Sequence, residues 1–157
     1  MSQKLGALAS LGGAFTAYSR ATGNEFPFVA MNDFHARAAT ARILSGALIV
    51  ESAFRVTLDQ KEQWNNFSTR NAGWFREGFS YQEQIGYQVQ NLPNYSEFDS
   101  ETINHDALIA SEIFTVASPT YARTRMTGGG PFYPMWQTSP VRATNFYNFD
   151  RYKNPSL

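Results

Sequence analysis

The sequence predicts an α+β fold in which long N-terminal helices pack on an antiparallel sheet. Through about residue 84, apolar residues recur at three- and four-residue spacing, which is typical of amphipathic helices. From Gly86 onward that period is lost, and β-prone stretches bounded by proline and glycine take its place. The chain has 157 residues, 43% of them hydrophobic and 15% aromatic, so it can bury a sizeable core. We expect one domain over 1–157, with a helix over 1–21, a helical part with one strand over 22–84 and a sheet-rich part over 85–157.

Composition excludes several classes of function. Thirteen basic residues balance thirteen acidic ones, so no electrostatic attraction of the whole domain to nucleic acid is expected. The absence of cysteine excludes disulfides, thiolate zinc sites and iron–sulfur clusters, and two histidines are too few for a multi-histidine metal site. We therefore expect no cofactor, no metal and no nucleic-acid partner.

The first expected helix carries an apolar and small-residue stripe. The stripe consists of Leu5, Leu8, Gly12, Phe15 and Ser19. It packs either on the domain's own core or, as a stalk, against a second copy of the chain. The uncharged stretch 5–19 is shorter than the roughly 20 apolar residues of a membrane span. The chain begins in what reads as mid-helix, which suggests a piece of a larger protein.

The second expected helix follows an extended apolar segment. Gly23 suits a left-handed end of the first helix, and Pro27 keeps the following segment extended. Asn32 or Asp33 can cap the next helix, which should end at Gly46. We expect this helix to bury Phe34, Ala38, Ala41, Ile43 and Leu44 and to present Arg37 and Arg42 to water.

An apolar run and an aromatic stripe follow. The four apolar residues 47–50 predict a buried strand. The spacing from Thr57 to Gln60 fits a capping box and predicts the start of one long helix, from Asp59 to Gln84. Aromatic residues at helical spacing along that helix indicate a core rather than a cofactor site. They are Trp64, Phe67, Trp74, Phe75 and Phe79.

The candidate ligand-binding residues lie on and near an aromatic segment over 132–140. They are Arg125, Tyr133, Met135 and Gln137. The prolines of this segment suit an edge strand, beside which a cleft can open. Alternation along a strand would place Tyr133, Met135 and Gln137 on one face and Trp136 on the other. Gln137 would supply a directional polar group and Arg125 an anion-binding fork. The alternative is that Trp136 and its neighbours close the core.

Charge is distributed unevenly along the second half. Residues 77–112 hold seven acids and no Lys or Arg, whereas residues 114–157 hold five bases and one acid. These two halves can pair with each other in the fold. The other interpretation is an anion site around Arg123 and Arg125.

No catalytic constellation stands out. The run Gly128–Gly130 lacks the Lys-Ser/Thr and the helix that follow a phosphate-binding loop, and no Gly-x-Ser-x-Gly motif is present. His35 falls in an expected helix and His105 in a polar capping segment, where structural or exposed histidines are the rule. We expect no catalytic residue in this chain.

A series of short motifs, in order along the chain, carries a family resemblance. They are Lys4-Leu5-Gly6-Ala7-Leu8-Ala9; Phe26-Pro27-Phe28-Val29 with Asp33-Phe34 and Arg37-Ala38; Ala41-Arg42-Ile43-Leu44-Ser45-Gly46-Ala47; Trp64-Asn65-Asn66-Phe67 with Trp74 and Glu77-Gly78; and Gly130-Pro131-Phe132-Tyr133-Pro134-Met135-Trp136-Gln137-Thr138-Ser139-Pro140. Together they resemble the extracellular sensor domain of diatom-type transmembrane receptor guanylate or adenylate cyclases, which has a CHASE- or PAS-like layout. The resemblance covers about 4–148. One departure is Ala30-Met31, where the pattern leads us to expect threonine after Val29.

The resemblance implies a non-catalytic, extracytoplasmic ligand-sensing domain of a receptor-type nucleotide cyclase. Its partners would be a small-molecule or peptide ligand and a second copy bound through the N-terminal helix. Contact with the membrane would come only through flanking helices outside this chain, at the extracellular face of the plasma membrane. The cyclase activity would belong to a separate domain. Two alternatives remain: a soluble enzyme of unknown chemistry, and a structural or interaction subunit without a ligand.

Overall fold

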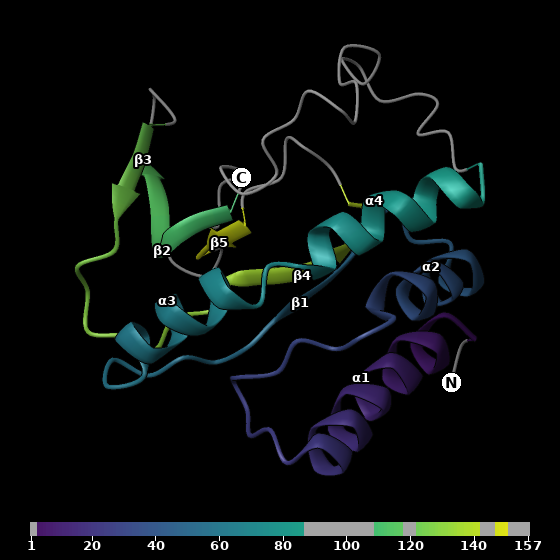
Figure 1. Ribbon diagram of the computed structural model, residues 1–157, viewed down its shortest axis with the longest axis horizontal. Helices are drawn as coiled ribbons and strands as arrows, with labels where there is room; N and C mark the ends of the chain where they lie inside the picture. Colours follow the sequence, from purple (N-terminus) through teal and green to yellow (C-terminus); the bar gives the residue numbers. More distant parts are fainter. Residues whose placement is uncertain (1–2, 87–108, 118–121, 142–146, 151–157) are drawn as a thin grey trace.

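The computed structural model describes residues 3–86, 109–117, 122–141 and 147–150 (Figure 1). These residues confirm the α+β class, with helices concentrated in the N-terminal half and most strands in the C-terminal half. The elements, in chain order, are α1 (Gln3–Thr22), α2 (Phe34–Ser45), β1 (Val50–Ala53), α3 (Lys61–Arg70), α4 (Trp74–Gln84), β2 (Ile109–Ala117), β3 (Ala122–Arg125), β4 (Met135–Ser139) and β5 (Tyr147–Phe149).

The described strands form two small sheets that meet at one bridge. Strands β1 and β4 are antiparallel, with Val50 opposite Ser139. Strand β2 lies between β3, which is antiparallel to it, and β5, which is parallel. An isolated bridge between Pro134 and Asp150 joins the start of β4 to the end of β5. The sheet is therefore mainly antiparallel, with one parallel pair that the sequence did not predict.

A bulge in β1 ties that strand to β4 through a side chain. The register shifts between Glu51 and Ala53, and Ser52 lies at the shift. The Ser52 hydroxyl accepts a hydrogen bond from the backbone N–H of Gln137 at 3.1 Å and donates one to the backbone carbonyl of Gln137 at 3.3 Å. The serine thus replaces ladder bonds that the bulge removes.

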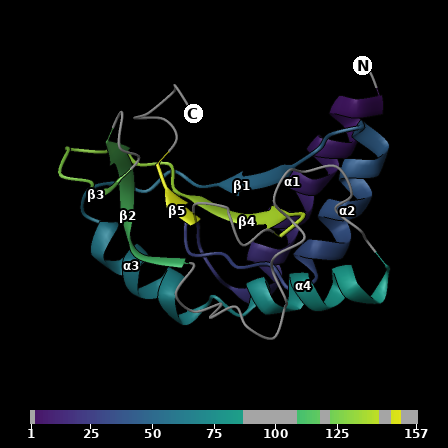
Figure 2. The same ribbon diagram turned by 90° about the horizontal axis from the view of Figure 1, so that it is seen from above.

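Helix α1 packs along α2 (Figures 1 and 2), and its Phe15 also meets the ring of Phe54, just after β1, with centroids 5.3 Å apart. Its buried residues are Leu11, Phe15 and Ser19, whereas Leu5 is 59% exposed and Leu8 41% exposed. Gly12 is exposed too, so only Phe15 and Ser19 of the expected stripe are buried within this chain. The neighbours α2, Val29, Met31 and Phe54 select the face of α1 that carries Leu11 and Phe15. Gly23 ends α1 with φ of 72°, as predicted.

Helix α2 buries a different face from the one predicted. Phe34, Ala38 and Ala41 are buried as expected, but Ile43 and Leu44 are exposed and Arg42 is only 7% exposed. The reason is that α2 packs against β4 and α4 as well as α1. Arg42 faces β4, where its Nε donates to the Ser139 hydroxyl at 3.3 Å. Gly46 ends the helix in the left-handed region, as predicted.

The apolar run 47–50 is mostly outside the strand that it was expected to form. Strand β1 begins only at Val50, while Leu48 is 81% exposed and Ile49 is also exposed. Hydrophobicity alone does not place a residue inside, since the tertiary neighbours decide which apolar groups are covered.

The long helix expected over 59–84 is two helices. Helix α3 ends at Arg70, and Asn71 caps it, because both its backbone N–H and its side-chain Nδ2 donate to the carbonyl of Phe67. Helix α4 starts at Trp74, after a turn over 71–73. At the start of α3, the backbone N–H of Thr57 donates to Oε1 of Gln60, which is one half of the expected capping box.

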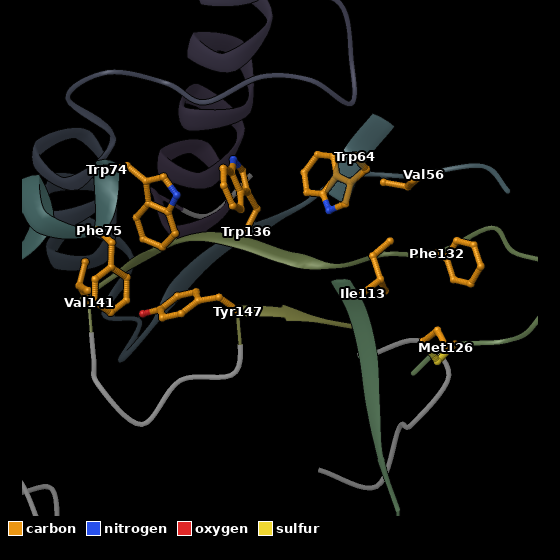
Figure 3. Packing of buried hydrophobic residues seen from close by; sticks show 10 residues of the cluster. All are labelled: Val56, Trp64, Trp74, Phe75, Ile113, Met126, Phe132, Trp136, Val141 and Tyr147. Carbon is orange, nitrogen blue, oxygen red and sulfur yellow. The ribbon is translucent and has the colours of Figure 1, made fainter. Parts of the chain in front are cut away.

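The aromatic core is closed around three tryptophans (Figure 3). The rings of Trp64 and Trp74 each meet Trp136 edge to face, with centroids 5.5 Å apart in both pairs. Trp64 donates its indole N–H to the side chain of Asn148. The burial of Trp64 and Trp74 is confirmed, at 0% and 6% exposure. Such edge-to-face pairs add to the stabilisation that burial of the rings provides.

Candidate functional site

The predicted site residue Gln137 fixes the segment that joins α1 to α2, which we call the strap (residues 25–32). Its side-chain Oε1 accepts from the backbone N–H of Met31 at 2.8 Å, and its Nε2 donates to the Met31 carbonyl at 2.9 Å. One residue before it, Trp136 donates its indole N–H to the carbonyl of Val29 at 3.2 Å. Gln137 is fully buried. Its amide therefore pairs with the backbone of the strap, and we place the candidate ligand site elsewhere.

The other residues of the predicted strand do not alternate between core and solvent. Met135 through Ser139 are all buried, and Tyr133 is half-buried. Both faces of β4 are covered, because α2 and the strap lie against it in addition to its strand neighbours. The alternative interpretation, in which Trp136 closes the core, is the one that the structure confirms.

Arg125 lies on β3, which pairs with β2 and not with β4. Its Nε is 2.7 Å from a carboxylate oxygen of Glu112, and the two side chains are 73% and 41% exposed. This contact pairs the acidic half of the sequence with the basic half. The structure does not bring Arg125 into either of the cavities described below.

A cleft of about 510 Å³ is lined in part by the strap, and Gln137 is not among its lining residues. Its volume falls within the range of about 300–1,000 Å³ that is typical of small-ligand sites. Five segments line it: the end of α1, the strap with the residue before it, the end of α3, the turn over 71–73 and the start of α4. The lining residues are Tyr18, Asn24, Ala30, Met31, Asn32, Phe67, Arg70, Asn71, Gly73, Trp74 and Glu77.

Of the six polar side chains that line the cleft, all but Asn71, whose Nδ2 donates to the Phe67 carbonyl, have unused hydrogen-bonding capacity. Tyr18, Asn24, Asn32, Arg70 and Glu77 make no side-chain hydrogen bond or ion pair within the part of the chain that the structure describes. By contrast, the buried amides of Gln137 and Asn148 are hydrogen-bonded to protein groups. Unused donors and acceptors that face one cleft are the groups by which a ligand can be recognised.

Four apolar side chains line the cleft. They are Ala30, Met31, Phe67 and Trp74, of which Met31 and Trp74 are buried and present little surface to a ligand. The indole N–H of Trp74 has no hydrogen-bond partner in the described residues, and its edge faces the ring of Trp136 (Figure 3). An N–H directed at an aromatic face makes a weak interaction, and here the indole edge of Trp74 contributes to the packing of the core.

Two opposite charges lie on the rim of the cleft and suit the helix ends that carry them. Arg70 is in the last turn of α3, and Glu77 is in the first turn of α4. A cation is favoured at a helix C-terminus and an anion at an N-terminus. Both residues are exposed. The cleft therefore offers a cationic and an anionic group to the same occupant.

The sequence analysis misses this cleft because it predicts one continuous helix over 59–84, where the structure has a turn between two helices. The signal that could have found it is Asn71-Ala72-Gly73, since asparagine and glycine are turn formers. A break there places Arg70 and Glu77 on either side of a turn. The strap was predicted, but the sequence did not show which of its faces meets the core.

A second, smaller cavity of about 250 Å³ lies between α1 and α2. Its lining residues are Ala7, Ser10, Leu11, Ala14, Arg37, Thr40, Ala41 and Leu44. Arg37 is its single charged residue, and small side chains make up most of its wall. It offers fewer groups to a polar ligand than the cleft does.

Comparison of the chain with protein-family models, with curated proteins and with solved structures finds no match. The described residues contain no group of three or more His, Asp or Glu side chains placed to hold a metal ion. Within the same residues, none of the helices combines the length and the hydropathy that crossing a membrane requires.

Proposed function

We propose that this chain is a non-catalytic, extracytoplasmic ligand-sensing domain of a receptor-type nucleotide cyclase. In this proposal the ligand binds in the cleft, and the N-terminal helix α1 relays the signal. The receptor would be a guanylate cyclase with its catalytic domain outside this chain. The domain would lie at the extracellular face of the plasma membrane. The motif resemblance given above supports the family, and the cleft supports the sensing role.

The main support for the sensing role is that residues of α1 and residues of α3 and α4 line the same cleft. Tyr18 comes from α1 and Asn24 from the loop just after it, whereas Arg70 and Glu77 come from α3 and α4. A ligand in the cleft therefore contacts both the end of the proposed stalk helix and the body of the domain. Its binding energy would favour one position of α1 relative to α3 and α4.

The same proposal includes a homodimer formed through α1. The helix carries no charged residue from Leu5 to Ser19, and its outer face is open, with no atom within 4 Å of a Cβ built at Gly6, Gly12 or Gly13. A second α1 could approach such a face closely. Light scattering coupled to size-exclusion chromatography tests this part. A dimer of the wild type that becomes a monomer on Gly13→Arg supports it, and a monomer at all concentrations contradicts it.

The enzyme alternative finds less support in the cleft. Its lining holds one carboxylate, Glu77, and no histidine or lysine. His35 lies outside the cleft and stacks on Tyr81, with ring centroids 4.8 Å apart. General acid–base catalysis usually needs at least two positioned titratable groups within reach of each other, and Glu77 makes no hydrogen bond to Tyr18, the other such group in the lining.

The experiment that tests the sensing role is a thermal-shift screen of small polar compounds on the wild type and on Asn32→Trp. Asn32 is exposed and makes no side-chain hydrogen bond, so a tryptophan there should fill the cleft without unfolding the protein. Gln63→Trp, an exposed change on α3 away from the cleft, is the matched control. A compound that stabilises the wild type and the control, but not Asn32→Trp, supports the proposal. Equal stabilisation of all three proteins would place the ligand site elsewhere.

The receptor assignment has a separate test. Membrane-spanning segments on both sides of this chain in its parent gene, and a cyclase domain downstream, would support it. The isolated chain, incubated with GTP or ATP and magnesium or manganese, should give no cyclic nucleotide. Turnover by the purified chain would overturn the non-catalytic assignment.

A further inference from the structure

The two charged residues on the rim of the cleft, Arg70 and Glu77, restrict the kind of ligand that it can bind. This inference rests on the proposed function of the cleft. Arg70 and Glu77 face the same cleft and are separated along the chain by one short turn. Yet neither forms an ion pair within the residues that the structure describes. Opposite charges that line one cleft without pairing favour an occupant that carries both an anionic and a cationic group.

The polar groups at the carboxylate end are arranged around the start of α4. Arg70, Asn71 and Gly73 line the cleft where α3 ends and α4 begins. The guanidinium of an arginine can hold a carboxylate through two parallel hydrogen bonds. The partial positive charge at the N-terminus of α4 is offset by the partial negative charge at the C-terminus of α3, so the attraction for an anion at this end comes from the guanidinium of Arg70. This end of the cleft therefore suits a carboxylate.

The anionic end lies one helical turn further on. Glu77 is four residues after Gly73, about 6 Å along the axis of α4, and helical side chains lean back toward the helix N-terminus. Its carboxylate therefore reaches toward the groups that would hold the ligand carboxylate. An ammonium group next to that carboxylate falls within reach of Glu77, and the amides of Asn24 and Asn32 can donate to or accept from either group.

The remaining wall of the cleft is apolar. Met31 and Trp74 are only 2% and 6% exposed, so the apolar area that a ligand side chain can cover comes from the half-buried Ala30 and Phe67. We propose that the cleft binds a free α-amino acid with an apolar side chain, its carboxylate on Arg70, its ammonium on Glu77 and its side chain on this wall.

The experiment is calorimetric titration of the chain with L-leucine and L-phenylalanine, and with two derivatives of leucine. N-acetyl-L-leucine lacks the ammonium group, and L-leucinamide lacks the carboxylate. We expect at least one free amino acid to bind, and each derivative of leucine to bind about 10-fold more weakly or worse than leucine. Failure of both amino acids to bind at millimolar concentration, or equal binding of leucine and its derivatives, would overturn the proposal.

Two variants assign the charges to their residues. Arg70→Gln should weaken leucine about 10-fold and leave leucinamide unchanged, because the amide has no carboxylate to lose. Glu77→Gln should weaken leucine similarly and leave N-acetyl-L-leucine unchanged. Arg55→Gln and Glu62→Gln, exposed changes outside the cleft, are the matched controls and should bind as the wild type does. The same loss in the controls, or no loss in the cleft variants, would contradict the assignment.

Failure of this inference is distinguishable from failure of the proposed function. If the amino acids do not bind, while another compound stabilises the wild type but not Asn32→Trp, the cleft is a ligand site for a different chemistry. If leucine binds the wild type and Asn32→Trp equally, the cleft is not the ligand site, and both proposals fail.

Discussion

The residues of β4 that hold the strap and the residues that line the cleft differ in how completely their polar groups are used. In β4, Gln137 and Trp136 are fully buried and hydrogen-bond to the backbone of Met31 and Val29. In the cleft, Asn24, Asn32, Arg70 and Glu77 are exposed and make no side-chain hydrogen bond in the described chain. A group whose hydrogen bonds are satisfied within the protein stabilises the fold, whereas a group with unused capacity is available to a ligand. Variants of the two sets should therefore fail in different ways.

The largest expected effect is in the aromatic core. Trp64→Ala should lower the free energy of unfolding by about 3–5 kcal/mol, because it removes a fully buried ring and leaves the amide of Asn148 without its indole donor. Urea unfolding followed by far-ultraviolet circular dichroism measures the change. A loss below about 1 kcal/mol would contradict the burial of this ring.

The bonds of Gln137 to the strap come next. Gln137→Ala should cost roughly 2–4 kcal/mol, since it leaves a buried N–H and a buried carbonyl of Met31 unpaired. Gln63→Ala, an exposed change on α3, should stay within about 0.5 kcal/mol. If both variants unfold at the same urea concentration, the strap is not held by this amide.

The close approach of α4 to Val141 gives a third test. A Cβ at Gly78 would collide with the side chain of Val141, so Gly78→Ala should destabilise by about 1–3 kcal/mol. Within one copy of the chain Gly13→Ala meets open space, so it should stabilise the monomer by about 0.5–1 kcal/mol, because alanine is the better helix former. Thermal unfolding of both variants checks the opposite signs.

The cleft should show the reverse behaviour, with loss of binding and little loss of stability. Arg70→Gln and Glu77→Gln change exposed side chains without partners in the described chain, so each should shift the free energy of unfolding by less than about 0.5 kcal/mol. Chemical denaturation measures this without a ligand. A cost above about 2 kcal/mol for either variant would assign that residue to the fold instead of to a ligand.

The smallest expected effect belongs to the ion pair of Arg125 with Glu112. Because both side chains are substantially exposed, Arg125→Ala should cost at most about 0.5 kcal/mol, and 1 M salt should remove the difference. Unfolding curves at low and high salt test this. A larger, salt-resistant cost would show that Arg125 packs more closely than its exposure indicates.

Local pattern determined much of the fold. The first two helices were predictable because their periodicity and their glycine ends, at Gly23 and Gly46, are properties of a few neighbouring residues. The burial of Trp64 and Trp74 was predictable too, since large aromatic residues at helical spacing have few alternatives to a core. The α+β class follows from the change of period near residue 86.

Only the tertiary structure decided which face of each element meets the core. Helix α2 buries Arg42 and exposes Ile43 because β4 and α4 lie on one side of it, and no local pattern carries that information. The sequence suggested that Gln137 binds a ligand, but its hydrogen-bond partner Met31 lies 106 residues away in the chain. The cleft likewise joins segments from Tyr18 to Glu77. Such contacts depend on long-range packing, so a sequence specifies which groups can interact locally, and the fold specifies which of them remain free.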